Sequence, residues 1–270
     1  NLALPDYFDI DKFYNLILKF DANIGSRNRA YFRHASNDRT EDRASNGINN
    51  KPGTDGQQPF QRINDAYVAD WTITATPTLI FDIRGSYNRF IEKGLGQANA
   101  GFDLTKLGIA PSLLAQLPSP VYFGRWNFGN GYNSLGRSQG KNTSNTFQLQ
   151  GTVTKVAGAH TIKAGADVRQ INYLIQDTGD ILSYSGDTTW TQSSNTLINR
   201  DGSIEGDGYA SFLLGIVSGS SNYPLFRWWR QPYAAFFLHD DWKVSRRLTL
   251  NLGLRYDITP FAHEKWHRQN

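Results

Sequence analysis

The stretch LTLNLGLRYD, residues 248–257, alternates apolar and polar side chains along its whole length. Successive side chains of a β-strand point to opposite faces, so this stretch predicts a strand with one apolar face and one polar face. A soluble β-sandwich would turn the leucines toward a protein core. An outer-membrane barrel would turn them toward lipid and the polar side chains toward a wet lumen.

Composition narrows the classes of protein that fit. The 270 residues include 39% hydrophobic residues, 13% aromatic residues and 25 glycines, which is typical of a β protein with polar loops. Cysteine is absent, which excludes disulfides and thiolate metal sites and favours an oxidising compartment. The net charge of +4 is scattered along the sequence, which argues against a nucleic-acid-binding surface. No apolar run approaches the roughly 20 residues of a transmembrane helix, but barrel strands need only about ten alternating residues.

The alternation recurs along the chain and predicts an all-β fold. Helical spacing fits none of these segments. The expected strands cover residues 14–21, 29–35, 65–73, 79–88, 147–154, 162–169, 234–243 and 248–257.

Short and long connections alternate between these strands along the chain. The short ones lie at 22–27, 74–78, 155–159 and 244–247, and the long polar ones at about 36–61, 91–142 and 174–221. In an antiparallel up-and-down meander every second connection lies at the same end, so all long loops share one end. Outer-membrane barrels have short periplasmic turns and long extracellular loops, whereas a sandwich has no reason to separate them.

The same parity predicts an even number of further strands, none or two, within 174–221. We expect about eight strands, with GYASFLLGI (208–216) as a short helix or turn, and ten strands as the alternative. Loops this long would crowd the rim of a closed eight-stranded barrel. Both ends of the sequence also look like cuts in a longer protein, since Asn1 follows no signal-peptide pattern and Asn270 lies in a polar stretch. The chain is therefore predicted to be part of a larger barrel.

The run YAAFFLHDDWKVSRRLTLNLGLRYDITPFAHEKWHRQN, residues 233–270, resembles the barrel of TonB-dependent outer-membrane receptors. The similarity is greatest to the Oar-like branch, which carries a carboxypeptidase-regulatory-like domain. Further matching pieces are TPTLIFDIRGSYNRF (76–90), GYNSLG (131–136), VAGAHTIKAGADVR (156–169) and ASFLLGI (210–216). The resemblance implies a barrel of about 22 strands in the Gram-negative outer membrane, plugged by a separate domain. This sequence would supply about a third of that wall, as one partial barrel domain over 1–270, and lacks the plug, the TonB box and the C-terminal strand.

The same resemblance implies partners and ligands. The whole protein would contact outer-membrane lipid, its own plug and, through the plug, the TonB energy-transducing complex. It would import a bulky, scarce extracellular ligand: a carbohydrate, a peptide or a siderophore. No cofactor, metal or catalytic group is expected. Candidate lumen-facing residues are Asp82, Arg84, Gln148, Gln150, Lys163, Asp167, Arg169, Asn251 and Arg255.

Aromatic residues gather in two of the long, loop-rich stretches. They could form platforms for a sugar or peptide, or they could pack the loops and form the aromatic girdle at the bilayer interface. The candidates for ligand contact are Trp126, Phe128, Tyr132, Trp228 and Trp229.

Several motifs suggest other chemistry. HEKWH, residues 263–267, has the H-E-x-x-H spacing of a zinc protease, but Pro260 precedes it and no helical pattern surrounds it, so we expect these histidines to decorate an extracellular loop. Asp240 and Asp241 are adjacent in a strand, so they point to opposite faces and cannot act together on one substrate. DGSIEGD (201–207) lacks the spacing of a calcium loop, and GLGQANAG (94–101) lacks a βαβ context.

Two other functions remain open on the sequence alone. The same barrel could belong to a non-transporting surface protein, such as an adhesin. A soluble β-sandwich hydrolase is the more remote alternative.

Overall fold

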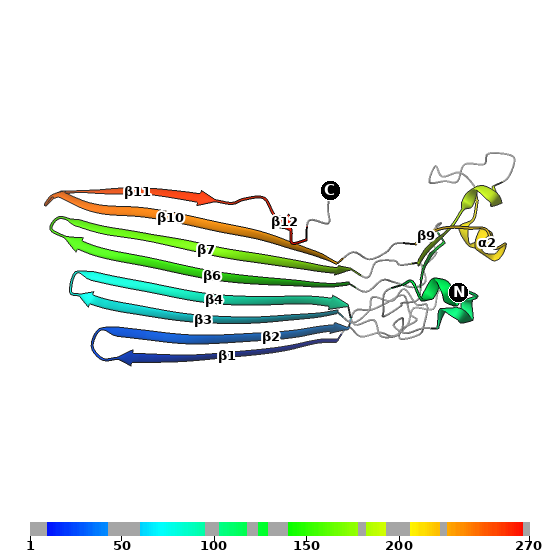
Figure 1. Ribbon diagram of the computed structural model, residues 1–270, viewed down its shortest axis with the longest axis horizontal. Coiled ribbons are helices and arrows are strands. Elements are labelled where there is room, and N and C mark those ends of the chain that lie inside the picture. The colour runs from blue at the N-terminus through cyan, green and yellow to red at the C-terminus, as the bar shows by residue number, and fades with distance from the viewer. Residues whose placement is uncertain are drawn as a thin grey trace.

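The computed structural model describes residues 10–42, 60–94, 103–117, 124–128, 140–177, 182–192, 206–221 and 226–266. Its main feature is one antiparallel sheet whose eight long strands follow each other in chain order (Figure 1). The strands are β1 (Ile10–Ile24), β2 (Asn28–Asp42), β3 (Phe60–Thr76), β4 (Leu79–Gly94), β6 (Gly140–Ala157), β7 (His160–Asp177), β10 (Arg227–Ser245) and β11 (Leu248–Ile258). The sheet does not close on itself, because β1 and β11 lie at its two edges. The predicted all-β meander of eight wall strands is confirmed.

The turns at one end of the sheet are very short. β1 and β2 are joined by three residues, 25–27, and β6 and β7 by two, 158–159. Gly25 and Gly158 have φ of 66° and 59°, a left-handed conformation that costs glycine least. All four short turns lie together at the left of Figure 1, and the strands lead into the long connections at the opposite end. We call these the turn end and the loop end.

The strands run farther toward the loop end than the alternation predicted. β2 continues to Asp42 and β4 to Gly94, still in register with their neighbours. Polar side chains occupy both faces there, as with Asp38 and Arg39, so the alternation disappears while the backbone ladder continues. Apolar and polar residues therefore alternate only in the part of a strand whose two faces have different surroundings.

One face of the sheet, the apolar face, carries a continuous apolar surface. Strand pairing aligns its residues in rows that cross all eight strands, and many large side chains in them are exposed, including Leu254 at 75%. Two adjacent rows are Phe20, Phe32, Ala69, Gly85, Leu149, Val168, Ala234 and Ile258, and Ala22, Ala30, Trp71, Ile83, Gly151, Ala166, Phe236 and Tyr256.

Aromatic rings border this surface at both ends. Toward the loop end, His34 stacks on Tyr67 at 4.5 Å between ring centroids, and Tyr87 contacts Phe147 at 4.8 Å. Toward the turn end, His160 stacks on Trp242 at 5.3 Å. Phe147 and Ala157 mark these borders on β6, about 33 Å apart along the strand, or about 25 Å across a bilayer at the usual strand tilt. This height matches the apolar band of an outer-membrane barrel.

A second folded unit, the loop cluster, lies beyond the loop end (Figure 1). Its sheet has three strands, β5 (Arg125–Asn127), β8 (Leu182–Gly186) and β9 (Val217–Ser221). The described part of 174–221 therefore holds two extra strands, and neither of them joins the wall. The predicted helix within 208–216 is present as α2. The helices are η2 (Leu104–Leu107), α1 (Pro111–Leu114), η3 (Thr188–Thr191) and α2 (Gly208–Leu213).

Hydrogen bonds fasten the segments of the loop cluster to each other. Ser211 is fully buried and donates to the Asp187 carbonyl at 2.5 Å, and the Asp207 N–H donates to Thr191 Oγ1 at 2.7 Å. The Asp187 carboxylate accepts from Thr189 at the start of η3, which lowers the pKa of that carboxyl. Gly208 admits no side chain, since a Cβ there would lie 2.0 Å from the Phe128 carbonyl oxygen.

Candidate functional site

The polar face of the sheet, opposite the apolar face, holds a hollow of about 430 Å³ between β3 and β11. It is positioned by strand alternation, since the predicted lumen-facing residues occupy every second place on β4, β6, β7 and β11. Lining residues include six of those predicted, Asp82, Arg84, Gln150, Lys163, Asp167 and Arg255.

Most charges around the hollow are held in pairs. Arg84 Nε lies 2.8 Å from Asp70 Oδ2, and the Asp70 side chain is only 6% exposed. Asp167 accepts from Arg169 Nε at 3.1 Å and from Gln148 and Gln150 at 3.0 and 3.2 Å. A carboxylate with this many donors is fixed in place.

Tyr233 connects these pairs to the edge strand. The Arg169 guanidinium lies over the Tyr233 ring, 5.0 Å from its centroid. The Tyr233 hydroxyl donates to Asp257 Oδ1 at 2.5 Å and accepts from Arg255 Nη2 at 2.9 Å, while Arg255 Nε donates to Asp257 at 2.9 Å. A polar network thus crosses β7, β10 and β11.

Two charged groups in the hollow have no ion pair among the described residues. Asp82 accepts only from the Thr72 hydroxyl, at 2.9 Å, and the exposed Lys163 ammonium has no hydrogen-bond or ion-pair partner there. Because their neighbours are already neutralised, Asp82 and Lys163 are the groups in the hollow with charge left for a second molecule. The arrangement can bind polar or charged groups.

The remaining predicted lumen residues share this face. Gln148 and Arg169 belong to the contacts of Asp167, and Asn251 lies opposite Asp241 in the β10–β11 register. Their contact with a ligand or a plug stays a prediction. Asp70 and Tyr233 were not predicted. Alternation in 65–73 could have identified Asp70, but Tyr233 lies one residue before the predicted start of its strand.

The predicted loop aromatics occupy two different places. Trp126 stacks on Tyr184 at 4.3 Å, and Phe128, only 4% exposed, meets Phe212 edge-on at 5.0 Å, so both contribute to packing in the loop cluster. Trp228 and Trp229 lie at the loop end of β10. Tyr132 lies outside the described residues. Ligand contact by any of them stays a prediction.

The HEKWH motif does not form a helix in its described part. β12 (His263–Glu264) pairs with Trp229 and Arg230 of β10. Glu264 is 5% exposed and accepts the Trp266 N–H at 2.7 Å, and Lys265 lies 4.3 Å from the Trp228 ring centroid. His267 lies outside the described residues. Across the described ranges, no three histidine, aspartate or glutamate side chains gather closely enough to hold a metal ion.

The buried Glu264 carboxylate should therefore be structural. Glu264→Ala removes the acceptor for the Trp266 N–H and should release β12 from β10, with a local loss of about 1–3 kcal/mol. Hydrogen exchange in residues 259–266 should rise while the rest of β10 and β11 stays protected. His263→Ala, on the exposed side of the same two-residue strand, is the matched control. Equal exchange in both variants would contradict this role.

Two of the other histidines, His160 and His239, lie within hydrogen-bond distance of aspartates. His160 Nδ1 lies 2.7 Å from Asp240 Oδ2 near the turn end, and His239 Nε2 lies 2.9 Å from Asp241 Oδ1 on the polar face. The two adjacent aspartates thus point to opposite faces, as predicted.

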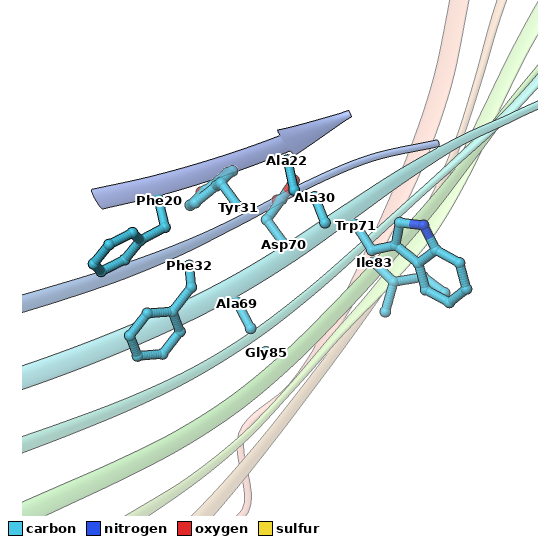
Figure 2. A pocket seen from close by; sticks show the side chains of 10 residues that line it. All are labelled: Phe20, Ala22, Ala30, Tyr31, Phe32, Ala69, Asp70, Trp71, Ile83 and Gly85. Carbon is cyan, nitrogen blue, oxygen red and sulfur yellow. The ribbon is translucent and has the colours of Figure 1, made fainter. Parts of the chain in front are cut away.

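A second hollow, of about 530 Å³, lies on the apolar face. The side chains of Phe20, Phe32 and Trp71 stand around the small residues Ala69 and Gly85 (Figure 2). Its lining is almost wholly apolar, and Asp70 is the one charged residue among the lining residues. No helix in the described ranges has the length and apolar character to cross a membrane.

Comparisons with known proteins agree with this architecture. A family model described as "Outer membrane beta barrel domain" matches residues 8–270. TonB-dependent transporter Oar from Myxococcus xanthus is 28% identical over 102 residues, which are 37% of this chain and 9% of that protein.

Two solved structures match over most of the length of this chain. The outer membrane transporter YddB from Escherichia coli matches with a TM-score of 0.51 at 10% identity, over 94% of this chain and 28% of its own. The siderophore receptor PiuA from Acinetobacter baumannii matches with a TM-score of 0.48 at 14% identity, over 92% of this chain and 35% of its own. The chain therefore spans only a small part of each of these proteins.

Proposed function

Because the chain belongs to the outer membrane beta barrel domain family and is located in the Gram-negative outer membrane, we propose that it forms part of the wall of a TonB-dependent importer. In this proposal residues 1–270 are one partial barrel domain. The apolar face contacts lipid, the polar face lines the lumen, the turn end is periplasmic and the loop end is extracellular. A plug and the TonB complex supplied by the rest of the system provide gating and energy.

The observation that carries the proposal is the contrast between the two faces of one continuous sheet. A face of exposed leucines and aromatic rings about 25 Å high needs a lipid environment, because water would make it an aggregation surface. The opposite face places paired charges and two unpaired ones, Asp82 and Lys163, around a hollow. Charged groups at that depth are stable only where water, a plug or a ligand meets them.

The imported ligand is proposed to be bulky and polar: a carbohydrate, a peptide or a siderophore. Oar is named as a TonB-dependent transporter, which supports import as the activity. The wall itself changes no covalent bond of the ligand. Its contribution is to hold the plug and to offer binding groups along the route.

Reversal of the charge at Lys163, which has no ion pair among the described residues, tests this function. Cells that produce the whole protein with Lys163→Glu should lose growth on the nutrient it imports, tested with oligosaccharides, an oligopeptide mixture and ferric siderophores as limiting sources. Loss of TonB should abolish the same growth. Arg246→Glu in an exposed periplasmic turn is the matched control and should grow normally.

Normal growth on every source without the protein, or growth that ignores TonB, would contradict import. That outcome would favour the non-transporting surface protein on the same barrel. Heat-modifiable migration in gels shows whether each variant has assembled, so that a growth defect is read only from assembled protein.

A further inference from the structure

The apolar face continues as a basic surface where β4 and β6 extend above the aromatic border. This face of β4 carries every second residue, in order Tyr87, Arg89, Ile91 and Lys93. Lys141 on β6 is the direct cross-strand neighbour of Lys93. Like charges placed opposite each other destabilise a sheet, so this pair needs a compensating charge.

The described structure does not supply that charge. Among the described residues, Arg89, Lys93 and Lys141 have no ion pair or side-chain hydrogen bond. Asp65 lies opposite Arg89 on β3, but its carboxylate accepts from the Ser36 hydroxyl at 2.8 Å and makes no ion pair with Arg89.

The opposite face at the same height behaves differently. Arg62 pairs with Glu41 at 2.5 Å and with Glu92 at 3.8 Å, and Arg39 pairs with Asp11 at 2.7 Å. At this height the polar-face cations Arg39 and Arg62 are thus neutralised within the sheet, whereas Arg89, Lys93 and Lys141 on the outward side are left for an outside partner.

The heights of these cations above the aromatic border favour one class of anionic lipid over another. Arg89 stands about 5 Å above Tyr87 along the bilayer normal, the depth of a phospholipid headgroup, whereas Lys93 stands about 15 Å above it. The row between them on the same face is apolar on β3 and β4, with Ile63 opposite Ile91. A phosphorylated sugar headgroup above acyl chains reaches both levels, and a simple phospholipid headgroup reaches only the lower one.

We propose that Arg89, Lys93 and Lys141 form a binding site for a phosphorylated glycolipid of the outer leaflet. Its phosphates would lie between Lys93 and Lys141 and beside Arg89, and its acyl chains would lie over the aromatic row of Tyr67, Tyr87 and Phe147. This site rests on the proposed lipid contact and orientation of the wall, and it is independent of what the lumen imports.

Lipid retention tests the site. The whole outer-membrane protein would be purified in mild detergent and titrated with lipopolysaccharide of phosphorylated inner core, with the same glycolipid after phosphatase treatment, with phosphatidylglycerol and with inorganic phosphate. Binding would be followed by native mass spectrometry. The wild type should prefer the phosphorylated glycolipid, and inorganic phosphate should not displace it.

Lys93→Gln with Lys141→Gln should weaken that binding about 25-fold, at roughly fivefold for each charge near the surface. Lys93→Arg with Lys141→Arg should keep it. Arg246→Gln with Arg247→Gln removes the same charge from a turn at the other end of the sheet and should bind as the wild type does.

Three results would overturn the site: equal binding by the glutamine pair and the wild type, equal loss in the turn variant, or full displacement by inorganic phosphate. A preference for phosphatidylglycerol would contradict the choice of lipid. Each result is separable from the import test, because no transported ligand is involved and growth is not measured.

Discussion

The Val153→Arg variant should assemble much less stably in a bilayer, whereas its neighbour Thr152→Arg should assemble normally. Val153 lies on the apolar face between Phe81 and Ala164, near the middle of the apolar band. Arginine at such a depth on the lipid side of a barrel costs about 2–4 kcal/mol. Thr152 has the same depth but lies on the polar face, opposite Asp82, where an added guanidinium gains a carboxylate.

Both variants can be measured in one experiment. The whole protein would be refolded into short-chain phosphatidylcholine vesicles across a urea series, and the folded fraction read from heat-modifiable migration. Val153→Arg should shift the midpoint to markedly lower urea, and Thr152→Arg should stay close to the wild type. Equal midpoints would refute the assignment of the two faces, and a loss in Thr152→Arg alone would reverse it.

Val153 and Thr152 also show why this fold could be predicted from the sequence. Each wall strand alternates because it separates two surroundings, so periodicity alone gave both the strands and their faces. LTLNLGLRYD has this property from Leu248 to Asp257, and β11 ends one residue later at Ile258. Where both faces have polar surroundings, as around Asp38 and Arg39, the alternation of apolar and polar residues is lost. The strands therefore extend farther toward the loop end than the alternation predicts.

Contacts between strands were much less predictable. Arg84 was expected on the polar face, but its pairing with Asp70 depends on the β3–β4 register, which a two-residue turn sets. Lys93 and Lys141 are 48 positions apart, and only the β4–β6 pairing makes them neighbours. Residue type and parity therefore predict which face a group occupies, and register decides which groups are paired.

The loop cluster was the least predictable part, because its packing joins segments with no periodic pattern. Trp126 meets Tyr184, and Phe128 meets Phe212 and Tyr209, across two separate long connections. The sequence shows aromatic residues in both connections but gives no reason to pair them. With these contacts made, the Phe128 ring is 4% exposed and packs within the loop cluster, and its contact with a ligand stays a prediction.

Removal of the Phe128 ring should unfold the loop cluster locally and leave the wall intact. Phe128→Ala deletes the ring that makes edge-on contacts with both Tyr209 and Phe212, in a unit with few other buried apolar side chains among its described residues. Phenylalanine to alanine in a packed core costs about 3–5 kcal/mol, which exceeds what so small a unit can lose. Hydrogen exchange in residues 182–192 and 206–221 should rise strongly, while β6 and β7 keep their protection.

Trp190 provides the matched control, because it belongs to the same cluster and is 68% exposed. Trp190→Ala should leave exchange within the cluster nearly unchanged, so any loss of ligand capture in that variant reports on surface contact. If Phe128→Ala instead lowered ligand capture with no change in exchange, Phe128 would be a ligand platform. The two variants thus distinguish aromatic rings that pack inside the loop cluster from aromatic rings that are exposed on its surface.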